Sequence, residues 1–156
     1  MKITILSVGT IKEAYLKDAI LEYSKRLSKY CKTDFIKVAD EPILDNVSIE
    51  QVKNKEGERL LKAMPNHSFR IALDLKGTML SSVELANKIQ EICSYQDSHI
   101  TFIIGGSLGL SDEVLASVNY RLCFSKMTFP HQLMQVILLE QIYRSFKIIH
   151  NETYHK

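Results

Sequence analysis

The sequence predicts an α/β fold in which helices flank a mainly parallel five- to six-stranded sheet. Short β-branched or aromatic runs alternate five times with segments of helical periodicity, the order expected of a parallel sheet. One run, Ile100–Ile104, is apolar enough to be buried on both faces of such a sheet. A length of 156 residues with 46% hydrophobic residues suits a single domain, residues 1–156, with a substantial core.

The first half of the chain supplies two strands and two helices. Lys2–Val8 is the first predicted strand, and an amphipathic helix follows over Ile11–Tyr30 with apolar residues at spacings of three and four. Phe35–Val38 marks the second strand. The next helix spans Ser48–Met64, where Gln51 completes a capping box with the first residue.

The second half supplies the remaining strands. Phe69–Leu75 is the third, a turn follows at Lys76–Thr78, and Ser81 or Ser82 caps the next helix. The apolar run described above is the fourth strand, and Tyr120–Phe124 is the fifth. Ligands gather at the carboxyl ends of parallel strands. The ends of the third, fourth and fifth strands therefore mark the predicted binding site.

Three glycines follow the fourth strand within the five residues Gly105–Gly109. Glycine permits positive φ and lets a ligand approach the main chain where a Cβ would clash. Ser111 then opens a helix with an acidic first turn. The spacing G-G-x-x-G is neither the G-x-G-x-x-G dinucleotide motif nor a P-loop, so no phosphate cradle is indicated. A tight βα turn without a ligand is the alternative.

A second turn, Ser125–Phe129, follows the fifth strand and leads into Pro130. Proline suits the first turn of a helix, and with Pro130 as the first helical residue, Phe129 occupies the N-cap position and offers no side-chain acceptor. Nearby amides are then left for water or a ligand. The helix that follows is apolar on nearly every side, which predicts either a deeply threaded position or a subunit interface.

Charge is unevenly distributed, although the net charge is only +2. Residues 1–37 carry eight Lys/Arg and four Asp/Glu, residues 119–156 carry five and two, and residues 38–118 carry seven and twelve. If the two basic ends meet in space, they form a positive face suited to nucleic acid. The alternative is that they only solvate surface helices. The first helix contributes one stripe to this face, formed by Lys25, Lys29 and Lys32.

Cysteine usage and hydropathy indicate the compartment. Cys31, Cys93 and Cys123 are scattered and form neither a zinc pattern nor a disulfide framework. We therefore expect a reducing environment and no metal. No apolar run is long enough for the core of a signal peptide or for a membrane span. The expected location is the cytoplasm, with no membrane contact.

Five segments together resemble one known family. They are ITILSVGTIKEAY at the start, KEGERLL in the middle, GGSLG after the fourth strand, FSKMTFPHQLMQVILLEQIYR around the last turn, and the terminal YHK. In combination they are similar to the RlmH family, the ribosomal RNA large subunit methyltransferase H group of the SPOUT superfamily. The resemblance spans essentially the whole chain.

The resemblance implies a C-terminal trefoil knot, a homodimer and S-adenosylmethionine as the cofactor. It also implies methylation of N3 of a pseudouridine in 23S rRNA within assembled ribosomes. The family's cofactor contacts fall on the three predicted strand ends and on the turn after the last of them, at Leu73, Gly105, Phe124, Ser125, Lys126, Met127, Thr128 and Phe129.

Four residues are candidates for the chemistry. His131 lies beside the cofactor turn and is the first candidate base, because an imidazole titrates near neutral pH; the alternative is that it orients the turn. Arg144 is either a clamp on phosphate or base carbonyl, or an ion-pair partner of Glu140. Tyr154 either stacks on the target base or packs across the dimer. His155 is the second candidate base, on the strength of the resemblance alone.

One position departs from the family pattern. Gln135 stands where members usually have arginine in the PHxLxR portion of the last helix. If that arginine lines the active site or the dimer seam, its role is absent here or is filled by Lys126 or Arg144. A non-catalytic ribosome- or RNA-binding factor with the same fold is therefore the competing prediction. A nucleotide-binding oxidoreductase is disfavoured by the missing dinucleotide motif.

Overall fold

The computed structural model describes residues 1–156 and contains a five-stranded sheet in the order β2-β1-β4-β3-β5. All four strand pairings are parallel, which confirms the predicted fold class. The order is consistent with the knot that the resemblance implies, and the knot stays a prediction. The strands are β1 (Lys2–Val8), β2 (Lys32–Val38), β3 (Phe69–Met79), β4 (His99–Ile104) and β5 (Tyr120–Cys123).

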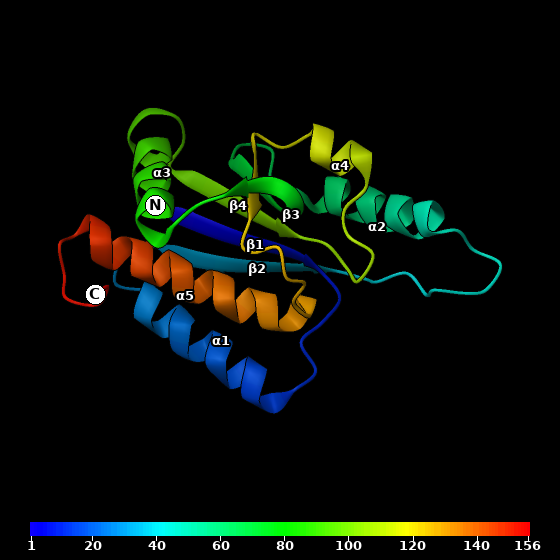
Figure 1. The fold of residues 1–156 in the computed structure, drawn as a ribbon, viewed down its shortest axis with the longest axis horizontal. Helices are drawn as coiled ribbons and strands as arrows, with labels where there is room; N and C mark the ends of the chain where they lie inside the picture. Colours follow the sequence, from blue (N-terminus) through cyan, green and yellow to red (C-terminus); the bar gives the residue numbers. More distant parts are fainter.

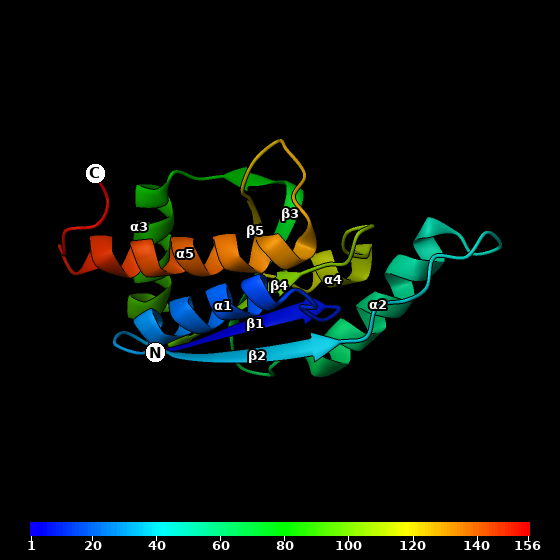
Figure 2. The same cartoon turned by 90° about the horizontal axis from the view of Figure 1, so that it is seen from below.

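Five helices cover the two faces of the sheet (Figures 1 and 2). One core cluster joins α1, α3 and α5 to one face, and a second joins α2 and α4 to the other. None of the helices combines the length and apolarity needed to cross a bilayer. The helices are α1 (Ala14–Leu27), α2 (Ile49–Ala63), α3 (Ser82–Tyr95), α4 (Asp112–Ala116) and α5 (His131–Ile149).

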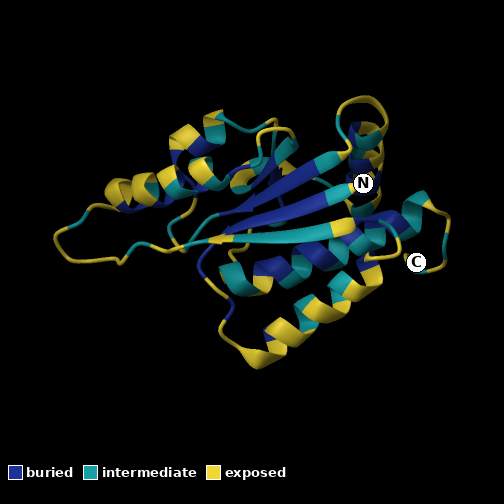
Figure 3. Cartoon of the chain, turned by 180° about the vertical axis from the view of Figure 1, so that it is seen from behind, coloured by how far each residue is buried: buried dark blue, intermediate teal, exposed yellow.

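Burial follows position in the sheet, as Figure 3 shows. The inner strand β1 is buried along nearly its whole length, whereas the edge strand β2 is only half-buried. The alternation along β1 serves both layers, since Ile3 and Ile5 face α1, α3 and α5, while Leu6 and Val8 join the cluster with α2 and α4. The sheet is therefore the middle layer of three.

Helix starts agree with the capping signals. Ser48 and Gln51 form the predicted capping box at the start of α2, and Ser81, rather than Ser82, forms one with Glu84 at the start of α3. α1 is shorter than the predicted Ile11–Tyr30 because the apolar residues beyond its ends pack in the core without being helical.

β3 differs most from its predicted form. It extends to Met79 instead of ending at Leu75, and it pairs with β5 on both sides of a register shift between Leu73 and Thr78. The four residues between them bulge out of the ladder. Gly77 permits this close return, because a Cβ there would lie 2.6 Å from the carbonyl oxygen of Arg121.

α5 begins one residue later than predicted. Pro130 is the N-cap, with an extended ψ of 136°, and its carbonyl accepts the first helical hydrogen bond from Met134 at 2.9 Å. No side chain caps the helix, so its first amides stay available. Contacts with α1, α3 and the sheet cover most of its apolar surface. The prediction offered a deeply threaded position or a subunit interface for this helix. Burial within the chain accounts for most of its apolar surface.

Candidate functional site

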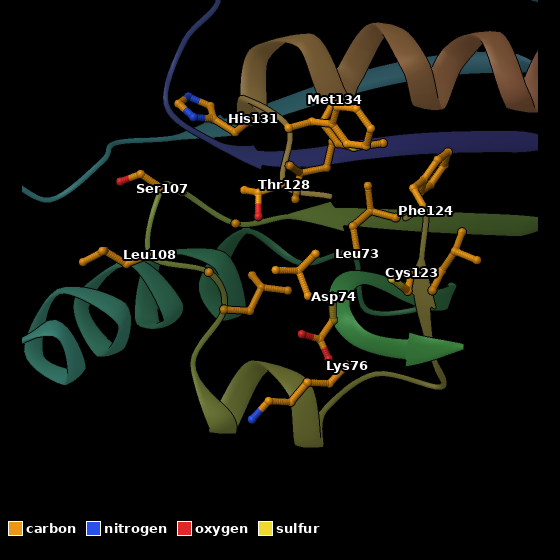
Figure 4. A pocket seen from close by; sticks show the side chains of 18 of the residues that line it. Leu73, Asp74, Lys76, Ser107, Leu108, Cys123, Phe124, Thr128, His131 and Met134 are labelled. Carbon is orange, nitrogen blue, oxygen red and sulfur yellow. The ribbon is translucent and has the colours of Figure 1, made fainter. Parts of the chain in front are cut away.

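A pocket of about 780 Å³ lies at the bulge of β3 and at the carboxyl ends of β4 and β5 (Figure 4). This is the place where the three predicted strand ends converge. The walls come from the β3 bulge, the glycine turn after β4, the turn after β5 and the first turn of α5. Leu73 and Thr128 point into this space (Figure 4).

The glycine turn after β4 folds back on its own main chain. The amide of Gly109 donates to the carbonyl of Gly106 at 3.1 Å, and Gly109 adopts φ +88°. A Cβ on Gly105 would lie 2.9 Å from the carbonyl carbon of Gly109. The predicted reason for glycine at position 105, close approach of a ligand, is therefore secondary, since the turn itself excludes a side chain there.

The β3 bulge is fixed to β5 by an ion pair. Arg121 donates from Nε to Oδ2 of Asp74 at 2.8 Å and makes a second, shorter contact through its terminal nitrogen. Asp74, Lys76 and Arg121 all line the pocket. None of these roles was predicted, because the bulge exists only once β3 and β5 are paired.

The turn after β5 contributes most of the predicted cofactor residues. Its shape is held by the Ser125 hydroxyl, which accepts from the amide of Met127 at 3.0 Å. Of the eight predicted cofactor residues, only Lys126 does not line the pocket. Those that do are Leu73, Gly105, Phe124, Ser125, Met127, Thr128 and Phe129.

His131, the first residue of α5, lies at the rim of this pocket. Figure 4 shows its ring turned toward the segment after β1. A Cβ on Gly9 of that segment would lie 3.3 Å from Nε2 of His131, and Gly9 itself has φ +81°. The Lys12 amide donates to Oε1 of Gln132 at 3.1 Å, which fixes the segment against α5. His131 is thus held between the pocket and the N-terminal segment.

The other three catalytic candidates gather at the far end of α5. Arg144 donates to Oε1 of Glu140 from Nε at 3.1 Å and from its terminal nitrogen at 2.6 Å. Its other terminal nitrogen lies 3.2 Å from Nδ1 of His155, and its guanidinium lies 4.7 Å from the centre of the Tyr154 ring. The Tyr154 hydroxyl donates to Glu140 at 3.1 Å. We call Glu140, Arg144, Tyr154 and His155 the tail cluster.

Within one chain, the tail cluster is separated from the pocket. Arg144 follows His131 by thirteen residues of helix, which is about 20 Å at 1.5 Å per residue. Burial and the neighbouring Glu140 carboxylate raise the pKa of Tyr154. Arg144 makes the ion pair with Glu140 that was one of its two predicted roles.

Glu152, which the sequence did not single out, anchors the tail. Its carboxylate accepts from Lys147 at 2.6 Å, from Tyr30 at 2.9 Å and from Lys29 at 3.1 Å. The hydrogen bonds from Lys147, Lys29 and Tyr30 lower the pKa of Glu152 to about 2. The residues after α5 are therefore tied to the turn that follows α1 and to α5 itself.

Gln135 is buried in the core and does not line the pocket. Its side-chain amide donates to the Ser7 hydroxyl at 3.1 Å, below the end of β1. The departure from the family pattern thus falls against the sheet.

The two basic ends meet, as α1 packs along α5. Lys25, Lys29 and Lys32 are all exposed, but the predicted stripe on one helix is wrong, because α1 ends at Leu27, Lys29 lies in the turn after it and Lys32 begins β2. Lys29 is tied to Glu152, whereas Lys25 and Lys32 make no ion pair. The α1 side of the molecule therefore carries exposed positive charge, in agreement with the predicted face.

The chain combines a parallel sheet with a pocket formed by the turns at its carboxyl ends. Residues 1–155 match the family model described as "Predicted SPOUT methyltransferase", so the class of protein is a SPOUT methyltransferase. Curated relatives called "Ribosomal RNA large subunit methyltransferase H" are similar over the full length of both chains, at 55% identity in Clostridium tetani and 57% in Alkaliphilus oremlandii. The chain belongs to the ribosomal RNA large subunit methyltransferase H family of SPOUT methyltransferases.

Two solved structures share the fold at low sequence identity. A probable methylase family protein from Haemophilus influenzae Rd KW20 matches with a TM-score of 0.60 and 17% identity, over 99% of this chain and 70% of that one. The tRNA (m1G37) methyltransferase of Aquifex aeolicus matches with a TM-score of 0.51 and 11% identity, over 92% and 70% of the two chains. Both likenesses support the fold alone.

Proposed function

We propose that the protein uses S-adenosylmethionine to methylate N3 of a pseudouridine in 23S rRNA within assembled ribosomes. The observation that carries this proposal is the pocket at three converging strand ends, in a chain whose full-length relatives are named for methylation of large-subunit ribosomal RNA. The proposal includes a homodimer that works in the cytoplasm without a metal.

The pocket fits the proposed cofactor in size and in lining. Sites for small molecules typically occupy about 300–1,000 Å³ and are mainly apolar with a few polar groups. Here Leu73, Phe124 and Met134 supply apolar walls, and the glycine turn supplies main-chain polar groups. When bound, the cofactor would supply a methyl group on a positively charged sulfur. We assign the cofactor contacts to the seven predicted residues that line the pocket. We assign Lys126, which does not line it, to binding of the RNA.

The chemistry requires removal of a proton from an imide nitrogen. A base must lie next to the cofactor space, and positioning supplies much of the remaining rate enhancement. His131 is the only histidine that lines the pocket, so we assign it the proton transfer. The alternative is that His131 orients the turn after β5.

We propose that two chains complete each site. Leu133, Val136, Glu140 and Arg144 follow one another at spacings of three, four and four, which places them along one side of α5. If two such helices pair antiparallel about a twofold axis, the tail cluster of one protomer lies near the pocket of the other. This arrangement would bring His131 of one protomer close to Arg144, Tyr154 and His155 of the other, although the two groups lie about 20 Å apart within one chain.

Two experiments test the proposed function. Calorimetry with S-adenosylmethionine, S-adenosylhomocysteine and NAD should show binding of the first two only. Mass mapping of 23S rRNA from a deletion strain should reveal one missing methyl group on a pseudouridine. A protein that binds ribosomes but neither the cofactor nor its product would instead be the non-catalytic factor.

A further inference from the structure

A second exposed feature lies apart from the basic face, at the end of the sheet that carries the pocket (Figure 1). Residues 39–52 connect β2 to α2 and include the first turn of α2. They project from the body of the molecule beyond the end of the sheet (Figures 1 and 2). We call residues 39–52 the acidic arm.

Three large apolar side chains are exposed on the arm. Ile43, Leu44 and Ile49 are 60%, 56% and 61% exposed, and none of them belongs to either core cluster. The amide of Val47 donates to the carbonyl of Leu44 at 3.1 Å, so the chain makes a turn over residues 44–47, just before α2. Isolated exposed apolar residues are ordinary, but three within seven residues of a projecting segment form a patch suited to a partner.

The arm is also strongly acidic. It contains four carboxylates, Asp40, Glu41, Asp45 and Glu50, and no Lys or Arg. Glu41 is neutralised by Arg59 at 2.5 Å and Lys55 at 3.4 Å, whereas the other three have no ion-pair partner. Uncompensated carboxylates around an apolar patch are repelled by nucleic acid phosphates and are complementary to basic groups.

The base of the arm is held in place. Arg59 donates to the Ala39 carbonyl at 3.1 Å, and the buried Glu56 accepts from the Glu41 amide at 3.1 Å. These contacts fix the start of the arm against α2. The arm therefore leaves the body of the molecule from a fixed starting point, which lowers the entropy cost of docking.

We propose that the acidic arm docks on a basic protein surface of the ribosome. Ile43, Leu44 and Ile49 would enter an apolar recess, with Asp40, Asp45 and Glu50 against Lys or Arg side chains at its rim. This inference rests on the proposed function. It adds a protein contact that only the assembled particle offers, beside the RNA contact of the basic face.

Photo-crosslinking identifies the partner. A benzoylphenylalanine at Leu44 should link this chain to a ribosomal protein, giving a product that survives ribonuclease. The same probe at Tyr95, an exposed position at the end of α3, should give no such product. A link from Leu44 to RNA or to a second copy of this chain, or no link at all, overturns the proposal.

Kinetics provides the second test. Ile43→Ser, Leu44→Ser and Ile49→Ser combined should raise KM for ribosomes about tenfold or more, with kcat and affinity for S-adenosylmethionine unchanged. The matched control, Val83→Ser with Tyr95→Ser, should behave as wild type. An unchanged KM in the triple variant overturns the docking proposal alone. A wild-type protein that neither binds the cofactor nor methylates ribosomes overturns the proposed function instead.

Discussion

Two glycines near the pocket hold a left-handed backbone, and a side chain added at only one of them would meet a candidate catalytic group. Gly9 and Gly109 have φ values of +81° and +88°. A Cβ on Gly109 would meet nothing within 4 Å, whereas one on Gly9 would lie 3.3 Å from Nε2 of His131. Substitutions at the two glycines can therefore distinguish the energetic cost of the backbone conformation from an effect on the position of His131.

We expect Gly9→Ala and Gly109→Ala each to lower the free energy of unfolding by about 1–3 kcal/mol, since both force a side chain into a left-handed conformation. Only Gly9→Ala should also shift the imidazole signals of His131 in NMR spectra. Identical histidine spectra in the two variants would show that Gly9 does not position His131.

Gly105→Val should abolish binding of S-adenosylmethionine, because its side chain would press on the carbonyl of Gly109 and open the turn. Calorimetry measures the affinity, and circular dichroism confirms that the variant is folded. Wild-type affinity in a folded variant would contradict the assignment of this turn to the cofactor.

His131→Ala should slow methyl transfer by about 10²–10⁴-fold if the imidazole is the base. Ribosome binding should stay close to wild type, and His67→Ala, at an exposed position, is the matched control. A loss nearer tenfold would identify His131 as an orienting residue. His155 would then be tested in the same way.

At the scale of elements, the tail is held by electrostatics more than by burial. Glu152 joins Lys147 of α5 to Lys29 just after α1, and Tyr154 packs edge-on against Tyr143 with ring centres 5.0 Å apart. Glu152 therefore anchors the start of the tail, while Tyr154 and His155 also contact Glu140 and Arg144 of α5.

The tail should detach in acid. The folded pKa of Glu152, about 2, lies below its ordinary value of 4.5, so its contribution to stability is complete above pH 4.5 and is lost as the pH falls toward 2. Glu152→Gln should mimic this loss at neutral pH. NMR signals of the Tyr154 ring should sharpen and move in that variant, and not in the control Glu58→Gln. Unchanged signals in both would show that Glu152 does not hold the tail.

The predictability of each element followed the range of the contacts that shape it. The start of α2 was predicted because Ser48 and Gln51 bond within one turn. The β3 bulge was not, because its Asp74 pairs with Arg121, 47 positions away. The strand ends indicated where the pocket lies, and the resemblance supplied the cofactor residues. Glu152 was missed because two of its three partners, Lys29 and Tyr30, lie 123 and 122 positions earlier.

At the scale of the whole molecule, the candidate site is divided between the two ends of α5. The pocket and His131 lie at the first turn, and the tail cluster lies about 20 Å further along. Most of the apolar surface of α5 is covered within the chain. A dimer contact through this helix would therefore use the side that carries Leu133 and Arg144. The dimer itself stays a prediction that sedimentation at micromolar concentration can check.

Mixed dimers test whether two chains share a site. His131→Ala and His155→Ala should each be inactive alone if both groups are needed. Co-refolded in equal amounts, they should recover about a quarter of wild-type activity, since half the dimers are mixed and each of these has one intact site. No recovery, with mixed dimers shown to form, would place both residues in the site of one chain.

The position of α5 also bears on how the protein is made. This helix is translated after the whole sheet and after α1 and α3, yet Leu138, Leu139, Ile142 and Phe146 complete the core between those two helices. Until α5 has been made, the apolar face that it covers stays exposed. The chain that precedes α5 is therefore a natural client for chaperones at the ribosome.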